Sequence, residues 1–143
     1  MYRGSRLAAS FLLVLTGLAV SAIALFVLPH TGAPLLVVAG IVAAILHFAA
    51  LVGIARGRDW GRNLAVFVAE IGGGVAILGA VALLTGAKPF GASSSSGIGL
   101  ILWTAAVYAL LGIAAGRVPV LSRLTPIERR RVVFGPSFAG MAG

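Results

Sequence analysis

The sequence contains no cysteine, and charged residues make up only 10% of its 143 positions. Without cysteine the chain can form no disulfide, no thiolate metal site and no cysteine nucleophile. Ordinary soluble domains carry about 25% charged residues, whereas 60% of the residues here are hydrophobic. Water is therefore not the main solvent of this chain.

Acidic residues are the scarcest charged class, with three Asp and Glu against eleven Lys and Arg. Two of the acids, Asp59 and Glu128, stand close to arginines in the sequence, which argues against hydrolytic acid–base machinery. The chain also lacks a phosphate-binding glycine loop, a metal-ligand cluster and a Ser–His–acid set at a shared depth. We therefore expect no enzyme, no cofactor and no metal.

Four long apolar blocks account for the hydrophobic residues, at 7–28, 35–55, 63–84 and 98–115. At 1.5 Å per residue each block is close to the roughly 30 Å of a bilayer core. The blocks predict an all-α fold, a polytopic bundle of four transmembrane helices over residues 1–116. Residues 117–143 are predicted to form a basic tail.

The first block has one alternative, because Arg3 and Arg6 precede it and Ala22-Ile23-Ala24 resembles the cleavage site of a signal peptide. The block is long for the apolar region of such a peptide. Its length favours an uncleaved membrane anchor.

The net charge of +8 is distributed unevenly along the chain. Every arginine lies before the first block, between the second and third, or after the fourth, and only Lys88 falls on the other side. By the positive-inside rule this pattern places both termini in the cytoplasm. The rule also explains the basic charge, so we expect no nucleic-acid partner.

The cytoplasmic loop and the tail are expected to meet lipid headgroups. The tail contains Thr125-Pro126-Ile127-Glu128, which combines a capping Thr with Pro at the first helical position and predicts a short helix near 126–133. Whether this tail binds lipid or protein, or only fixes topology, stays open. The predicted headgroup and interface contacts are made by Arg56, Arg58, Trp60, Arg62, Arg129, Arg130 and Arg131.

Two ionisable side chains stand out inside the spans, His47 in the second and Glu70 in the third. They lie at similar distances from Asp59 in the loop, so an antiparallel hairpin brings them to similar depth, and we expect them to pair. The pair would be a structural clasp or a proton-responsive site, and the lack of a second polar layer favours the clasp. A haem on His47 would need an axial ligand from elsewhere, because His30 lies at the opposite boundary.

Small residues at four-residue spacing predict close helix packing. The stretch Gly72-Gly73-Gly74 beside Glu70 also permits a kink or ion access, although packing is the commoner role. The predicted packing residues are Gly53, Gly57, Ala65, Ala69, Gly72, Gly73, Gly74, Gly112 and Gly116.

The loop sequence Gly57-Arg58-Asp59-Trp60-Gly61-Arg62 resembles the Gly-Arg-x-Trp-Ala-Arg element common in small four-helix membrane proteins of high-GC, actinobacterial-type bacteria. The resemblance covers six residues and the four-span layout, and Gly61 stands where Ala is usual. It implies a multi-pass protein of a bacterial cytoplasmic (inner) membrane and supplies no activity.

Three functions are compatible with these features. The abundant small-residue faces favour a non-catalytic subunit or assembly factor of a larger membrane complex, with membrane lipids and other subunits, or further copies of the chain, as partners. The alternative is a small oligomeric proton-coupled transporter or channel with Glu70 as its coupling site. A holin-like lesion former is a third reading, and it draws only on small size and the charged end.

Overall fold

A computed structural model gives the fold, and it describes residues 2–86, 94–120 and 126–128. The elements run in the order α1 (Tyr2–Ala22), a π-helical turn (Ile23–Val27), a 3₁₀ turn (Leu28–Thr31), α2 (Pro34–Ala55), α3 (Asp59–Leu84) and α4 (Ser94–Gly116). Every regular element within these described ranges is a helix.

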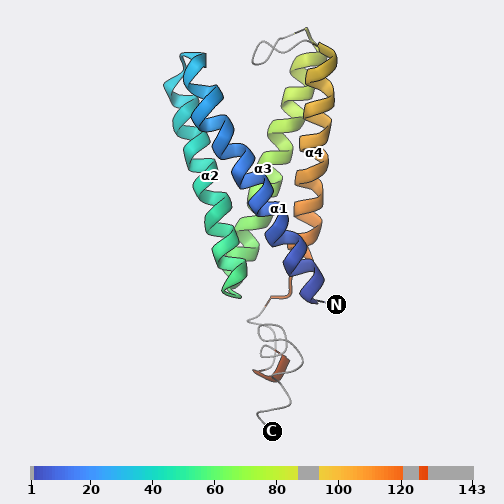
Figure 1. The fold of residues 1–143 in the computed structure, drawn as a ribbon. Helices are drawn as coiled ribbons and strands as arrows, with labels where there is room; N and C mark the ends of the chain where they lie inside the picture. Colours follow the sequence, from blue (N-terminus) through green and yellow to red (C-terminus); the bar gives the residue numbers. More distant parts are fainter. Residues whose placement is uncertain (1, 87–93, 121–125, 129–143) are drawn as a thin grey trace.

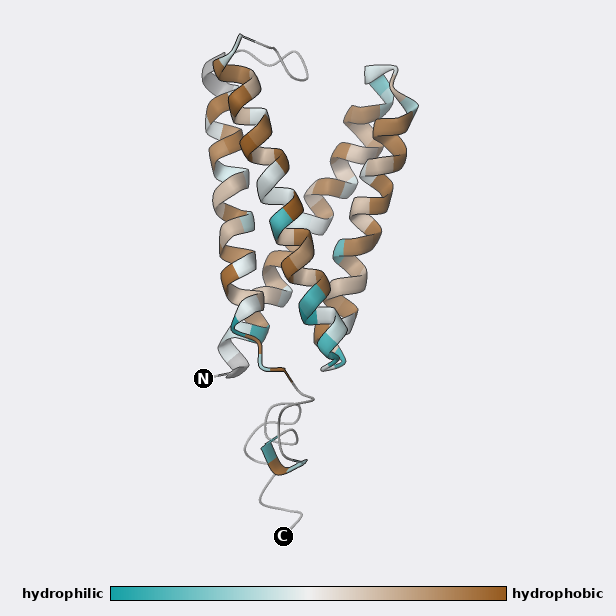
Figure 2. Ribbon diagram, turned by 180° about the vertical axis from the view of Figure 1, so that it is seen from behind, coloured by the Kyte–Doolittle hydropathy of each residue, from teal (hydrophilic) through white to brown (hydrophobic). Residues whose placement is uncertain are grey.

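Four of the described helical segments are long and apolar enough to cross a membrane, namely Gly4–Thr31, Pro34–Ala55, Asp59–Leu84 and Gly97–Gly116. The predicted all-α bundle of four membrane-length helices is therefore confirmed. The helices begin earlier than the apolar blocks do, at Tyr2 and Asp59 for α1 and α3. Hydropathy detects only the part of a helix that matches the hydrocarbon layer, whereas the helix continues into the polar interface (Figure 2).

The first hairpin turns at Pro29. Proline has no N–H to donate and its ring crowds the carbonyl one turn earlier, so the helix widens into the π turn and then tightens into the 3₁₀ turn. Gly32 ends this segment with a φ of 69°, in the left-handed region that glycine adopts without strain.

The second loop is a Schellman cap on α2. The N–H of Arg58 donates to the carbonyl of Gly53 at 2.8 Å, and the N–H of Gly57 donates to that of Ile54 at 3.0 Å. Gly57 has a φ of 64°. This corrects one sequence prediction, because Gly57 reverses the chain and does not form part of a helix-packing face.

The helices follow one another around the bundle, with α1 against α2, α2 against α3, α3 against α4 and α4 against α1. Figure 1 shows the α1–α2 hairpin and the α3–α4 hairpin together at the end that holds the N-terminus and diverging toward the other end. The continuous core lies in the joined half. It comprises Ala9, Leu13, Ala50, Ile54, Ala65, Val68, Ala69, Tyr108, Leu111 and Ala115.

Along one stripe of α3, the exposed fraction of the side chains rises as the two hairpins diverge. Val68 is 4% exposed, and the residues that continue its stripe away from the N-terminal end, Ile71, Val75 and Leu78, are 50%, 64% and 69% exposed. In that outer half each hairpin packs within itself. Ala24 and Leu28 are buried in the first hairpin, and Ala76 and Leu83 in the second.

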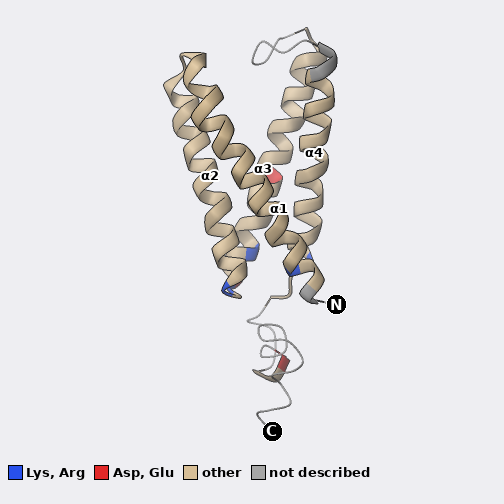
Figure 3. Cartoon of the chain, in the orientation of Figure 1, with Lys and Arg blue, Asp and Glu red and all other residues tan. Residues whose placement is uncertain are grey.

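Positive charge collects at the joined end of the bundle (Figure 3). We call this the basic end and define it by Arg6, Arg56, Arg58, Arg62 and Arg117. Lys88 and the arginine cluster at 129–131 lie outside the described residues. In the tail, 126–128 is helical, and the remainder of the predicted 126–133 helix lies outside the described part.

Candidate functional site

A buried hydrogen bond between side chains joins His47 of α2 to Tyr108 of α4, helices on opposite corners of the bundle. The Nε2 atom of His47 lies 3.0 Å from the Tyr108 hydroxyl, and the two side chains are 3% and 6% exposed. Nδ1 lies 2.7 Å from the carbonyl oxygen of Ala43. A carbonyl only accepts, so Nδ1 carries the hydrogen and the tyrosine hydroxyl donates to Nε2.

Glycines on the other two helices make room for this pair. A Cβ atom at Gly17 of α1 would lie 3.2 Å from the Cβ of His47, and one at Gly72 of α3 would lie 2.6 Å from Cδ1 of Tyr108. All four helices therefore shape the site. The T-shaped arrangement of the rings, with centroids 5.9 Å apart, fills the bundle centre at this level.

The predicted pairing of His47 with Glu70 is wrong. Both ring nitrogens of His47 already have partners, and Glu70 is exposed on the outside of the bundle. Ala69 and Gly72 face α4, and each residue turns a helix by about 100°, so Glu70 points away from the core. Equal depth does not place two side chains on facing surfaces. The same contacts leave neither nitrogen of His47 open to a haem iron.

Glu70 lies 11 residues after Asp59, about 17 Å along α3 and close to the middle of the helix. Across the described residues no hydrogen bond or ion pair involves its carboxylate. One turn further on, a Cβ atom added at Gly74 would meet nothing within 4 Å. A Cβ atom added at Gly73 would meet only the Cβ of Tyr108, at 4.0 Å. An acidic group thus stands beside open backbone on an otherwise apolar surface.

The tightest helix crossing is between α2 and α3, at Gly53 and Gly61. A Cβ atom at Gly53 would run into the backbone of Gly61, with the Gly61 nitrogen at 3.0 Å. Gly53 therefore packs as predicted from the sequence, and Gly61 is a partner that spacing alone missed.

The other predicted packing residues divide into two groups. Ala65 and Ala69 are buried, and a Cβ at Gly112 would lie 3.5 Å from the Cβ of Ala69, so these residues line helix contacts. A Cβ atom added at Gly74 or at Gly116 would meet nothing within 4 Å, so neither glycine contributes to packing inside this bundle.

Two arginines cap helices other than their own. Arg6, near the start of α1, donates from Nε to the carbonyl of Ile54 at 3.1 Å and from Nη2 to that of Ala55. Arg62, near the start of α3, donates from Nη2 to the carbonyl of Gly116 at 3.2 Å. The last carbonyls of a helix lack intrahelical partners, and the helix dipole favours a cation there.

The hydrogen bond to the carbonyl of Gly116 gives Arg62 a structural role that differs from the predicted headgroup role. The capping role of Arg6 has no clear signal in the sequence. Arg56, Arg58 and Trp60 are exposed at the basic end, where headgroup contact remains a prediction.

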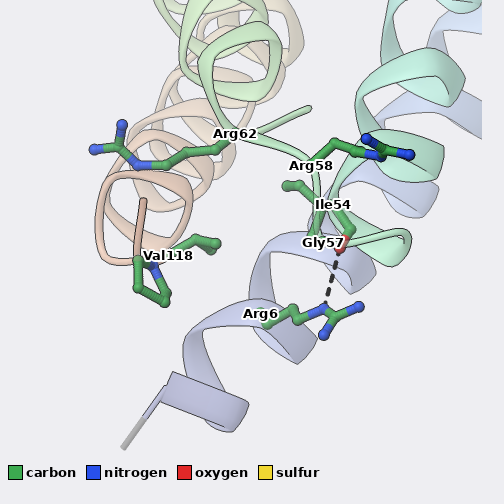
Figure 4. A pocket seen from close by; sticks show the side chains of 7 residues that line it. Arg6, Ile54, Gly57, Arg58, Arg62 and Val118 are labelled. Carbon is green, nitrogen blue, oxygen red and sulfur yellow. Dashed lines mark hydrogen bonds between the residues drawn. The ribbon is translucent and has the colours of Figure 1, made fainter. Parts of the chain in front are cut away.

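A small pocket lies at the basic end, between the start of α1, the loop that joins α2 to α3 and the residues that follow α4. Its lining includes Arg6, Arg58 and Arg62 with Val118 and Pro119. Figure 4 shows the guanidinium groups of Arg58 and Arg62 directed away from each other. The pocket is therefore walled mainly by side-chain stems, and the charges do not converge on a common point.

Among the described residues no group of three or more His, Asp or Glu side chains is placed to hold a metal ion. Comparison with protein-family models, with curated proteins and with solved structures gives no match for this chain.

Proposed function

We propose that the protein is a non-catalytic membrane subunit or assembly factor that binds further transmembrane helices through the outer face of α3. The observation that carries the proposal is the position of Glu70, exposed near the middle of a membrane-length helix. A carboxylate at this depth costs about 2.5–3.5 kcal/mol on insertion scales and normally faces protein or water. Association with another helix provides that environment.

The neighbourhood of Glu70 suits a helix contact. Gly74 leaves the backbone open one turn away, and small residues of this kind let membrane helices approach closely. Phe67 and Ile77, on the same side of α3, are 48% and 60% exposed and offer apolar contact on either side of the acid. A partner helix would thus meet a polar centre within an apolar strip.

The interior of the bundle supports association more than transport. The buried polar groups of the described core are the side chains of Thr16 and His47 and the hydroxyl of Tyr108. Thr16 donates to the carbonyl of Leu12 at 2.8 Å, and His47 is fully engaged. A proton path through the bundle needs successive polar groups with free hydrogen-bonding capacity, whereas the donor hydrogens of Thr16, His47 and Tyr108 are already used by these contacts.

We further propose that the protein resides in a bacterial cytoplasmic membrane with the basic end inside. The support is the segregation of the described arginines at one end of the bundle, together with the loop that resembles those of small actinobacterial-type membrane proteins. In this orientation the exposed Arg56, Arg58 and Trp60 lie at the level of the cytoplasmic headgroups.

Site-specific photo-crosslinking in native membranes tests the association. The photoreactive residue p-benzoylphenylalanine replaces Phe67, one turn from Glu70, or Phe11 of α1, which is 68% exposed on another face. Adducts are expected from position 67 and not from position 11, and Glu70→Gln should reduce them. Equal labelling from both positions, or none from position 67, would contradict the proposal.

A further inference from the structure

We infer that the Glu70 face of α3 binds a transmembrane helix of a different protein, and that this helix carries an Arg or Lys side chain near mid-membrane. The inference rests on the proposed function and adds the chemistry of the partner. It follows from the charge of the face and from what the chain itself can offer at that depth.

The face has a single charged centre. Glu70 is exposed, and within the described residues it has no hydrogen-bonding or ionic partner in its own bundle. Phe67, Gly74 and Ile77 surround it on the same side of the helix with apolar or open surface. A carboxylate in such a setting is best matched by a cation, because charge-assisted hydrogen bonds are the strongest available to it.

The described part of the chain supplies no such cation at this depth. Its arginines lie at the basic end, and the nearest one along α3, Arg62, stands 8 residues or about 12 Å before Glu70 and donates to the carbonyl of Gly116. The remaining intramembrane candidate, His47, is buried and has both ring nitrogens engaged. Because the described residues offer no free cation at this depth, we place the matching charge on another chain.

A second copy of this chain is a poor occupant. Copies inserted by the same charge rule share one orientation, so a two-fold axis between them runs along the membrane normal. Packing α3 on its equivalent then sets Glu70 against Glu70 at equal depth. Two carboxylates in one apolar site repel each other, whereas a basic side chain forms an ion pair with the carboxylate of Glu70.

The test uses the full-length chain in phosphatidylcholine vesicles and designed single transmembrane helices as probes. Three probes of about 22 Leu and Ala residues differ only at the centre, which is Arg, Leu or Asp. Binding is measured by energy transfer between a fluorescent protein fused after Gly143 and a dye on the probe. The expected result is that the Arg probe binds on the order of tenfold more tightly than the Leu probe.

Three variants make the test specific. Glu70→Gln should reduce the Arg probe to the affinity of the Leu probe, while Glu128→Gln, which removes an acid outside the spans, should leave it unchanged. Glu70→Lys should reverse the preference and bind the Asp probe. Because Glu70 lies outside the core, both Glu70 variants should keep the wild-type melting temperature, which shows that the fold is intact.

Two results would overturn the inference. If the Arg probe binds no more tightly than the Leu probe, the partner helix does not carry a basic side chain at this depth. If the chain self-associates through Glu70 in probe-free vesicles, the occupant of the face is a second copy. The first result does not bear on the photo-crosslinking from position 67. Adducts there combined with an indifferent Arg probe would retain the membrane-subunit proposal and reject only the basic partner.

Discussion

Replacing Gly53 by alanine should destabilise the bundle, although alanine is the better helix former. The added Cβ would meet the Gly61 backbone, with the Gly61 nitrogen at 3.0 Å and Cζ3 of Trp60 at 2.9 Å. Carbon atoms in comfortable contact are about 3.5–4.0 Å apart, so α2 and α3 must separate at their crossing. Overpacking of this kind costs about 1–3 kcal/mol.

Helix propensity acts in the opposite direction. Alanine in place of a helical glycine contributes about 0.5–1 kcal/mol, so the net loss at Gly53 should be about 1 kcal/mol. Gly99 of α4 is the matched control, because a Cβ there meets nothing within 4 Å. Gly99→Ala should therefore keep the propensity gain alone and raise the free energy of unfolding.

Steric trapping or reversible unfolding in mixed micelles measures both variants against the wild type. The two alanines should move the free energy of unfolding in opposite directions. If Gly53→Ala proves as stable as Gly99→Ala, α2 and α3 do not approach closely enough at Gly53 and Gly61 for an added Cβ to separate them.

Three further predictions use other contacts of the bundle. Tyr108→Phe removes the hydroxyl that donates to His47 and should lower the free energy of unfolding by about 1 kcal/mol, whereas an unchanged value would show that the hydrogen bond contributes nothing. Arg6→Gln should destabilise by about 1 kcal/mol through the lost cap on α2, while Arg56→Gln, at an exposed position, should stay within about 0.5 kcal/mol of the wild type. A fluorescent protein fused after Gly143 should fluoresce in the cytoplasm and alkaline phosphatase fused there should be inactive, and the reverse pattern would refute the proposed orientation.

The membrane-length helices could be predicted because the signal is large and local. Blocks of about 20 apolar residues match the bilayer thickness and have few competing explanations. Their ends were less predictable, since Tyr2 and Asp59 begin helices within polar sequence. The Schellman cap at Gly57 shows a second limit. The four-residue spacing from Gly53 predicts a helix-packing glycine, and only the backbone conformation, with its positive φ, shows that Gly57 ends the helix.

The partner of His47 could not be found by sequence reasoning about charge. His47 and Gly72 both lie against Tyr108, but sequence spacing does not give the face of α3, and a shift of one residue from Ala69 carries a side chain about 100° around the helix. Tyr108 gave no signal of its own, because an aromatic residue in an apolar helix is ordinary core material. A donor search over tyrosine and tryptophan at matching depth would have included it, since both usually bond a partner when buried.

The candidate binding face around Glu70 does not overlap the contacts that hold the bundle together. The Gly53–Gly61 crossing, which joins the two hairpins, and the caps that Arg6 and Arg62 make within each hairpin all lie in the half of the bundle near the basic end. Glu70 stands near the middle of α3 and on its outer side. A partner helix docked there would displace no core contact, so its binding energy would not be offset by unfolding any part of the bundle. For the same reason, substitutions at Glu70 should separate association from stability, which few buried polar residues in a membrane protein allow.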